Sequence, residues 1–361
     1  MKAAVLHKQH MPLLIEEIDI SNPKPGEIRV KMVGGGVCHS DYHRIDGHSD
    51  IKTLPFVMGH EGSGIVTEIG EGVSALSPGD HVVFSLTAQC GHCRNCSLGR
   101  ANLCDTYVRG SGVMHDGTTR MSKDGITYYH GLATFSEETI VLASSAVKVR
   151  DDVPLEKLCL IGCGVMTGVG AVINRAKVKT GSTVAVFGCG GVGLNVVQGA
   201  VLASAAKIIV VDKVDLKLEM ARQMGATHFI NATTEDPIKR IMNITKGGVD
   251  YSFEVIGFPH TIRQAFDSVR PGGTAVMVGV PPERADISIP GRSLFLDRTL
   301  MGTFYGAGRP RVDFPWLIDL YVDGRLKLDE LITKYRPLEE VNEAFNDMND
   351  GISARTILTF N

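Results

Sequence analysis

The sequence predicts an α/β protein with two domains, one built on a doubly wound parallel sheet and one rich in β-strands. The chain has 361 residues, which is too long for one ordinary hydrophobic core. Short β-branched runs broken by Gly, Pro and Asp fill roughly the first 150 residues. From about Lys179 onward, apolar strand patterns alternate with helical patterns, which is typical of a parallel sheet covered by helices on both faces.

The expected elements can be placed in chain order. In the β-rich part we expect strands over 27–38 (EIRVKMVGGGVC), 62–70 (GSGIVTEIG) and 80–86 (DHVVFSL). In the alternating part we expect strands over 182–188, 207–212, 249–257 and 274–280, with helices over 192–205, 216–226 and 261–273. The pattern then becomes mixed again and ends with a helix over 338–351 and a short strand over 355–360.

Composition and charge exclude several classes of function. The net charge is -3 and no basic block is present, which argues against binding to nucleic acid or to an anionic membrane. The N-terminus lacks the apolar core of a signal peptide, and no run reaches the roughly 18 apolar residues of a membrane span. We therefore expect a cytoplasmic protein whose eight cysteines are reduced and serve metal binding, catalysis or core packing.

Half of the cysteines lie within fifteen residues, in the pattern C-x2-C-x2-C-x7-C. They are Cys90, Cys93, Cys96 and Cys104. Four thiolates at these spacings can bind one tetrahedral zinc ion, and such a site has no open position for a substrate. We therefore predict a structural zinc ion. The alternatives are an iron–sulfur cluster and a nucleic-acid-binding zinc module, and the lack of basic residues argues against the second.

A second motif predicts a dinucleotide site in the alternating part. Its glycines, spaced G-x-G-x-x-G between a strand and a helix, are Gly188, Gly190 and Gly193. They allow a tight turn, close approach of a pyrophosphate to the backbone, and close packing of helix on strand, as in a Rossmann domain. Asp212 ends the next strand and favours NAD over NADP, although Lys213 and Lys217 slightly weaken this preference. The alternative is a glycine-rich turn without a ligand.

Three separate residues are candidates for an open metal site. Cys38, His60 and Cys163 each lie beside glycine, on segments that could turn into a cleft. Two Cys and one His leave the fourth position of a zinc ion free for water or alcohol. Spacing alone supports this site weakly, because a single Cys or His more often lies in a core or on the surface.

Together these motifs resemble the zinc-dependent medium-chain alcohol dehydrogenases. "GVCHSD", "GHEGSGIV", the four-cysteine run, "GCGVMTGVGA", "FGCGGVG" and "RTILTF" occur in the family's order and cover essentially the whole chain. The long segment after Cys104 resembles the dimeric liver-type and formaldehyde-dehydrogenase-like branch. The resemblance implies a GroES-like catalytic domain (1–164 and 305–361), a Rossmann domain (165–304), and a homodimer, with a homotetramer as the alternative.

The resemblance also implies roles for individual residues. Cys38, His60 and Cys163 would bind a catalytic zinc ion, with Glu61 behind it and Asp41 orienting the imidazole of His60. Ser40 would hydrogen-bond the substrate oxygen, and His43 would relay its proton to solvent. Further residues would contact the cofactor: His39, Thr167, Gly188, Gly190, Gly191, Val192, Gly193, Asp212, Lys217, Val280 and Arg355.

The expected activity is the reversible oxidation of a mainly primary alcohol, with hydride transfer to NAD. The alternative is a thiol-dependent formaldehyde dehydrogenase that acts on an S-hydroxymethyl-thiol. That branch has an arginine where this chain has Val108, followed by Arg109, and Leu86 stands where an aromatic residue often lines the substrate pocket. A zinc-independent quinone or enoyl reductase and a non-catalytic zinc- and nucleotide-binding protein are the remaining alternatives.

Overall fold

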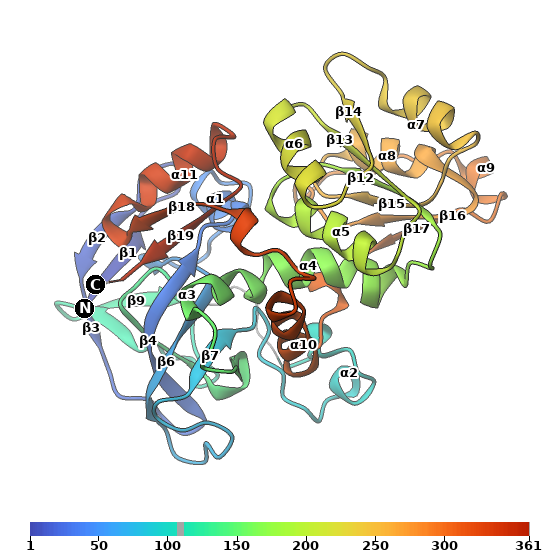
Figure 1. Cartoon of the computed structure of the whole chain (residues 1–361). Coiled ribbons are helices and arrows are strands. Elements are labelled where there is room, and N and C mark those ends of the chain that lie inside the picture. The colour runs from blue at the N-terminus through green and yellow to red at the C-terminus, as the bar shows by residue number, and fades with distance from the viewer. Residues whose placement is uncertain (107–111, 361) are drawn as a thin grey trace. The chain divides into compact units, whose positions relative to one another are not determined.

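The computed structural model describes residues 1–106 and 112–360, which form two compact units (Figure 1). Unit 1 comprises Met1–Cys163, Arg309–Gly324 and Leu331–Asn361, and unit 2 comprises Gly164–Gly308 and Arg325–Glu330. We propose that these units correspond to the two domains predicted from the sequence, 1–164 with 305–361 and 165–304.

Unit 2 contains a parallel sheet that has the strand order β14-β13-β12-β15-β16-β17 in the described residues. Its strands are β12 (Thr183–Phe187), β13 (Lys207–Asp212), β14 (His228–Asn231), β15 (Val249–Glu254), β16 (Val269–Met277) and β17 (Thr299–Gly302). In sequence order this is the 3-2-1-4-5-6 arrangement of a doubly wound fold. The predicted Rossmann sheet is therefore confirmed.

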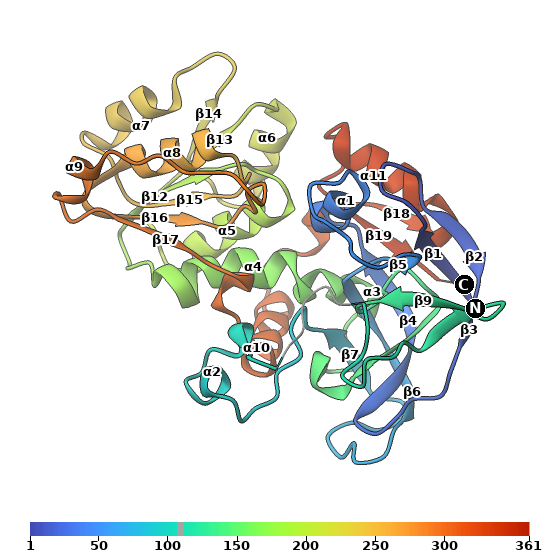
Figure 2. The same cartoon turned by 180° about the vertical axis from the view of Figure 1, so that it is seen from behind.

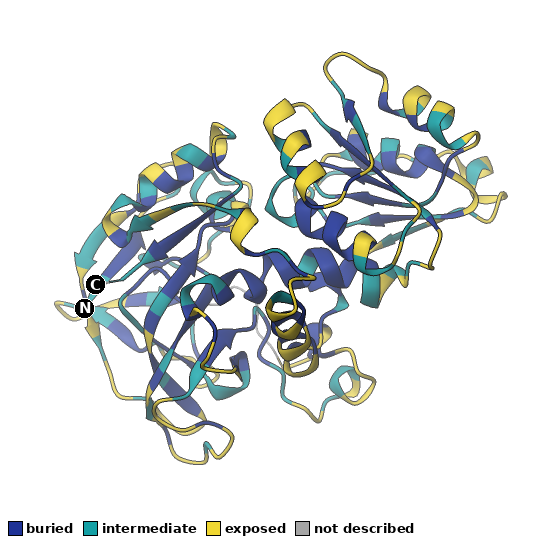
Figure 3. Ribbon diagram, in the orientation of Figure 1, coloured by how far each residue is buried: buried dark blue, intermediate teal, exposed yellow. Residues whose placement is uncertain are grey.

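Helices pack on both faces of this sheet (Figures 1 and 2). The helical elements of unit 2 are α4 (Gly164–Gly170), the π-helix η4 (Ala171–Ala176), α5 (Gly191–Leu202), α6 (Asp215–Gln223), α7 (Pro237–Thr245), α8 (Pro259–Ser268), α9 (Gly291–Leu294) and η5 (Tyr305–Ala307). The start of α7 is encoded locally, because Asp236 accepts the backbone N–H groups of Ile238 and Lys239 and Pro237 occupies the first helical position. The β-branched strands are buried between the helices (Figure 3).

Unit 1 is built from antiparallel and mixed sheets. Within the described residues, one sheet has the order β2-β1-β5-β9-β8-β3, and another has the order β11-β7-β6-β4-β19-β18, with β10 also paired to β4. The strands are β1 (Lys2–Leu6), β2 (Leu14–Glu17), β3 (Asp19–Ile20), β4 (Glu27–Gly36), β5 (Phe56–Val57), β6 (Glu61–Ile69), β7 (His81–Phe84), β8 (Met121–Lys123), β9 (Ile126–His130), β10 (Glu138–Leu142), β11 (Ala146–Lys148), β18 (Ile332–Pro337) and β19 (Arg355–Thr359). The last two strands return from the C-terminal part, so β19 lies against β4.

Helices and single helical turns connect the strands of unit 1, and α1 carries several of the candidate functional residues. These helical elements are α1 (His39–Ile45), α2 (Arg94–Ser97), η1 (Ala101–Leu103), η2 (Ala143–Ser145), α3 (Leu155–Leu158), η3 (Cys159–Gly162), α10 (Pro310–Val322), η7 (Leu338–Glu340) and α11 (Val341–Asn349), with η6 (Asp329–Leu331) at a boundary between the units. A core around Phe56, Phe135 and Phe345 holds α11 and the start of β5 together. The same cluster anchors α1, since Tyr42 and Ile45 of this helix pack against it.

Within residues 1–106 and 112–360, no single helix has the length and apolar composition needed to cross a membrane. One bent pair of helices, Leu155–Gly162 with Gly164–Ala176, passes on length and composition. Most side chains of these two helical segments are buried in the protein.

Candidate metal and cofactor sites

Cys38, His60 and Cys163 come together in unit 1 although they lie far apart in the sequence. Cys38 follows β4 and precedes α1, His60 directly precedes β6, and Cys163 follows η3. One ligand atom from each of them, together with a carboxylate oxygen of Glu61, lies within 4.8 Å of all the others. The Nε2 atom of His60 is 3.3 Å from the Sγ atom of Cys163, so the imidazole points at the sulfur atoms.

The electrostatics of this group suit a cation. A hydrogen bond from Cys163 and the neighbouring His60 hold the pKa of the Cys38 thiol well below its usual range. Burial lowers the pKa of His60, but the charges of Asp41 and Cys38 outweigh burial and raise the pKa to about 10. Asp41, itself buried, lies 2.9 Å from the Nδ1 atom of His60 and fixes the orientation of the ring. Two thiols and one oriented imidazole fit a zinc ion with one open position.

A buried ion pair lies beside the three candidate ligands. Glu61 is fully buried, and its Oε2 atom contacts the guanidinium of Arg355 on β19. The Oε1 atom of Glu61 is buried without a hydrogen-bond partner, which fits a carboxylate that faces a metal ion. Sequence reasoning assigned Arg355 to the cofactor pyrophosphate and did not foresee this pairing, since the two residues are 294 positions apart. The cofactor role of Arg355 stays a prediction.

Helix α1 carries the residues expected to handle the proton. It begins directly after Cys38, so Ser40 lies two residues beyond a candidate ligand and is exposed, while Asp41 faces inward. His43 lies one turn further on and is partly exposed, and the ring of His39 is 6.3 Å from the ring of His43. The helix therefore places a hydroxyl and two imidazoles near the candidate metal ligands; their roles stay predictions.

A small cavity of about 90 Å³ in unit 1 has His60 in its wall. Leu86, the residue expected to shape the substrate pocket, lines it, as does Phe56. Sequence reasoning missed Arg44, whose half-buried guanidinium also lines the cavity and lies 5.1 Å from the centroid of the Phe56 ring. In the described part of the chain, no carboxylate pairs with Arg44. The cavity wall therefore offers a cation to a ligand.

Val108, which stands where the thiol-dependent branch has an arginine, is followed by Arg109. Both residues lie outside the described residues.

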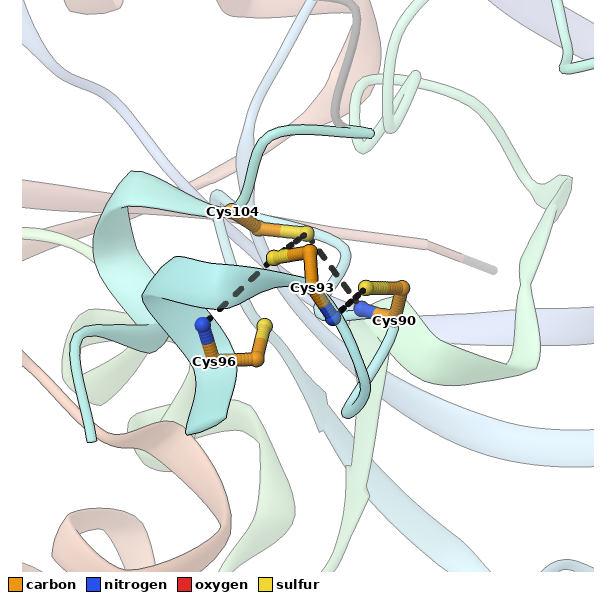
Figure 4. A group of neighbouring side chains, drawn as sticks. All are labelled: Cys90, Cys93, Cys96 and Cys104. Carbon is orange, nitrogen blue, oxygen red and sulfur yellow. Dashed lines mark hydrogen bonds between the residues drawn. The ribbon is translucent and has the colours of Figure 1, made fainter. Parts of the chain in front are cut away.

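The four clustered cysteines also converge, as Figure 4 shows. Their Sγ atoms lie within 4.8 Å of one another. The C-x2-C spacing directs backbone N–H groups at the sulfur atoms: the N–H of Cys93 is bonded to Cys90 at 3.3 Å, and the N–H of Cys96 to Cys93 at 3.4 Å. A thiolate is stabilised by such bonds, and four thiolates are the usual ligand set of a structural zinc ion.

The thiol acidities in this cluster diverge. Hydrogen bonds from the backbone of His92 and Cys93 lower the pKa of Cys90 to about 5. Burial and the neighbouring sulfur atoms raise the pKa of Cys96 to about 12. Four sulfur atoms this close repel one another when all are ionised, so a divalent cation is needed to hold all four as thiolates.

In unit 2 the glycine-rich turn connects β12 to the N-terminus of α5. Gly188 has a φ of +96°, a conformation that other residues rarely adopt. A Cβ atom on Gly193 would lie 1.9 Å from the carbonyl oxygen of Gly188, so only glycine allows the helix to approach the strand this closely. These two contacts are the physical basis of the spacing observed in the sequence.

Asp212 at the end of β13 stabilises the same turn. Its carboxylate accepts the N–H of Cys189 at 2.7 Å through one oxygen, and the N–H groups of Lys213 and Val214 at 2.7 and 3.0 Å through the other. The acid therefore lies at the carboxyl ends of neighbouring strands, where nucleotides bind in open parallel sheets. This arrangement fits a ribose-binding carboxylate beside a phosphate-binding turn.

The remaining candidate cofactor residues occupy different elements. Gly190, Gly191 and Val192 lie at the start of α5 and are partly exposed, as is Lys217 on α6. Thr167 lies on α4, and the side chain of Val280 after β16 is 61% exposed. Their contacts with a cofactor stay predictions.

The chain is similar to known proteins over its whole length. The family described as "Alcohol dehydrogenase GroES-like domain" matches residues 24–151, and the family "Zinc-binding dehydrogenase" matches residues 191–323. The S-(hydroxymethyl)glutathione dehydrogenase of Paracoccus denitrificans is 41% identical over 372 residues, which cover 99% of each chain.

Two solved structures are also similar. An alcohol dehydrogenase zinc-binding domain protein from Burkholderia ambifaria has a TM-score of 0.95 at 36% identity, covering 99% of this chain and 98% of that one. The benzyl alcohol dehydrogenase of Acinetobacter calcoaceticus also has a TM-score of 0.95, at 34% identity, covering 100% of this chain and 99% of that one.

Proposed function

Because the chain belongs to the zinc-dependent medium-chain alcohol dehydrogenases, in their formaldehyde-dehydrogenase-like branch, we propose that it oxidises the hydroxymethyl adduct of formaldehyde and a small thiol with NAD. The thiol is one that carries a carboxylate, as glutathione does. NAD is the proposed cofactor because the carboxylate of Asp212 would repel the 2′-phosphate of NADP.

In this proposal the protein holds the reacting groups in place. Cys38, His60 and Cys163 would hold a zinc ion, which would supply Lewis-acid stabilisation of the substrate oxygen, and bound NAD would supply the hydride acceptor. Asp41 fixes the imidazole of His60 through the 2.9 Å contact with Nδ1. Ser40 would accept the hydroxyl proton of the substrate and release its own, and His43 would pass the released proton on to solvent.

The observation that carries the thiol-adduct proposal is the position of Arg44. A guanidinium that is half buried, lines the same cavity as His60 and pairs with no carboxylate of the described residues can bind the carboxylate of a substrate. Relatives named S-(hydroxymethyl)glutathione dehydrogenase, at 41% and 42% identity, support the same substrate class.

A primary alcohol, such as benzyl alcohol, is the second candidate substrate. Leu86, Phe56 and other apolar residues line the cavity around His60. The similarity to a benzyl alcohol dehydrogenase, at 34% identity, also favours an uncharged substrate. An apolar wall discriminates weakly between alcohols that differ by one methylene group, so this activity would be broad.

Steady-state assays of NADH formation separate the two candidates. With formaldehyde and excess glutathione we expect a kcat/KM at least tenfold above that for benzyl alcohol. Arg44→Met should lower kcat/KM for the adduct about tenfold to a hundredfold, mainly through KM, because one charge-assisted contact is lost. Its kcat/KM for benzyl alcohol should stay within about twofold of the wild type, since that substrate has no charge to pair.

The opposite pattern would contradict the proposal. Rapid turnover of benzyl alcohol, no turnover of formaldehyde with glutathione, and no effect of Arg44→Met would establish a primary alcohol dehydrogenase. Arg44→Lys is the matched control, because it keeps the charge and should retain part of the adduct activity.

We further propose that the enzyme acts in the cytoplasm as a homodimer. None of the eight cysteines forms a disulfide bond, which fits a reducing compartment.

A further inference from the structure

Two imidazoles and one carboxylate converge at the end of α1, apart from the two cysteine sites. His43 lies in the last turn of α1, Asp46 caps its C-terminus, and His48 follows in the next turn of chain. One ligand atom from each of the three lies within 4.8 Å of the others. The rings of His43 and His48 are 5.0 Å apart between centroids. We call these three residues the His-Asp-His cluster.

The distances within the cluster are too long for hydrogen bonds. The Oδ2 atom of Asp46 is 3.8 Å from the Nδ1 atom of His43 and 3.6 Å from the Nδ1 atom of His48, beyond the usual hydrogen-bond range. They match the separation of two ligands on one ion. Nitrogen and oxygen ligands at zinc-bond lengths, in tetrahedral geometry, lie roughly 3.4 Å apart.

Two further observations show that ligand atoms of the cluster are available to a metal ion. Asp46 already uses its other oxygen, Oδ1, to accept the backbone N–H of His48 at 2.9 Å, which fixes the carboxylate and leaves Oδ2 facing both rings. The Nδ1 atom of His43 is buried and has no hydrogen-bond partner. A buried ring nitrogen without a partner is costly unless another group satisfies it. A cation at the centre of the cluster would satisfy it.

We propose that His43, Asp46 and His48 bind a third metal ion, a divalent transition metal such as zinc. Imidazole nitrogen with one carboxylate is a ligand set that zinc, copper and nickel accept readily. Three ligands at a half-exposed site leave the remaining positions to water, so the ion binds more weakly than the ions at the cysteine sites and exchanges with the solution. The effect on activity rests on the proposed function, in which His43 relays the proton. Because the bound ion occupies the Nδ1 atom of His43, it slows turnover.

Zinc binding to the holoenzyme tests the proposal directly. The protein, loaded with two zinc ions per chain, is titrated with zinc sulfate by calorimetry and by equilibrium dialysis. We expect one additional ion per chain. His48→Ala and Asp46→Asn should each weaken its binding at least tenfold, while Asp46→Asn keeps the oxygen that accepts the N–H of His48. His260→Ala removes an exposed histidine of unit 2 and should change nothing.

An activity measurement then tests the regulatory consequence. Added zinc should inhibit the wild type reversibly and inhibit His48→Ala at least tenfold less, since His48 lies outside the proposed proton route. Failure to bind a third ion, or equal binding by the wild type and both variants, would overturn the metal site. If no substrate is turned over, the proposed function fails, but the binding titration still decides whether the metal site exists.

Discussion

At the scale of single residues, His130 shows how burial sets a charge state. Its side chain is buried, its Nδ1 atom is 3.0 Å from the carbonyl oxygen of Gly131, and its Nε2 atom accepts the backbone N–H of Arg120 at 3.3 Å. Burial, assisted by the nearby Arg120 guanidinium, lowers the pKa of His130 to about 4. An unfolded histidine has a pKa of about 6.5, so only the unfolded state binds a proton between these two values.

His130 should therefore make the protein less stable in mild acid. Because the unfolded state binds more protons between pH 6.5 and pH 4, the free energy of unfolding falls as the pH falls through this window. We expect a loss of about 2 kcal/mol from this residue between pH 7 and pH 5. Urea unfolding of the wild type and of His130→Asn at both pH values measures it, and the variant should lose about 2 kcal/mol less.

His260→Asn, at an exposed histidine, serves as the control in the same experiment. Its free energy of unfolding should keep the pH dependence of the wild type. Equal pH dependence in the wild type and His130→Asn would show that His130 does not contribute.

The residues of the candidate site differ in how far the sequence could predict them. Cys38, His60 and Cys163 were candidates by residue type and neighbouring glycines, and the family resemblance strengthened the grouping, since spacing alone carries little information about contacts across more than a hundred positions. The contact of Asp41 with His60 follows from the same resemblance. Arg44 has no motif of its own, and its place in the cavity depends on how α1 packs on Phe56. Such contacts are set by tertiary packing and cannot be derived from local pattern.

At the scale of elements, the segment from Cys90 to Cys104 contains little regular secondary structure. It contains α2, with four residues, and the single turn η1. Helices of this length are not stable without other contacts, and none of the residues of α2 is buried. A metal ion bound by all four thiols would therefore supply the segment with its main cross-link.

Cys96→Ala should remove this ion and leave the other cysteine site intact. After dialysis against zinc-free buffer, metal analysis should fall from two zinc ions per chain to one. The melting temperature should fall by about 5 °C or more, because several kcal/mol of metal-linked stability are lost. Cys159→Ala is the matched control, since Cys159 is a buried cysteine outside both clusters, and it should retain both ions. Retention of two ions by Cys96→Ala would refute the structural role.

The pairing of strands could be predicted from the sequence where the partners are close along the chain, and not where they are far apart. The strands of unit 2 follow one another as β-α-β repeats, so their apolar runs and the glycine-rich turn were sufficient to predict a parallel sheet. In unit 1, by contrast, β19 pairs with β4 across more than 300 residues. RTILTF was predicted to be a strand, but nothing in its sequence indicates its partner, because register depends on which faces are buried.

At the scale of the whole molecule, the sheet of unit 2 has an edge that suits association. Strand β17 pairs with β16 on one side, and in the described residues no strand covers its other side (Figure 1). Just before it, Phe295 is 88% exposed, and Leu294 and Leu296 are each 49% exposed. An uncovered strand edge beside exposed apolar side chains is a site where another chain can add. We propose that a second copy of this protein binds there.

Two copies related by a twofold axis would place the same edge against itself, so a single substitution alters the interface twice. The wild type should elute as a dimer in size-exclusion chromatography with light scattering, at twice the mass of one chain. Phe295→Lys should shift it to the monomer at micromolar concentration, because it places two like charges in an apolar contact.

Val312→Lys, at a side chain that is 60% exposed on α10, controls for an added surface charge and should remain dimeric. A monomeric wild type, or a dimer that Phe295→Lys leaves unchanged, would contradict this assembly, whereas a tetramer that Phe295→Lys converts to dimers would mean that a second interface exists.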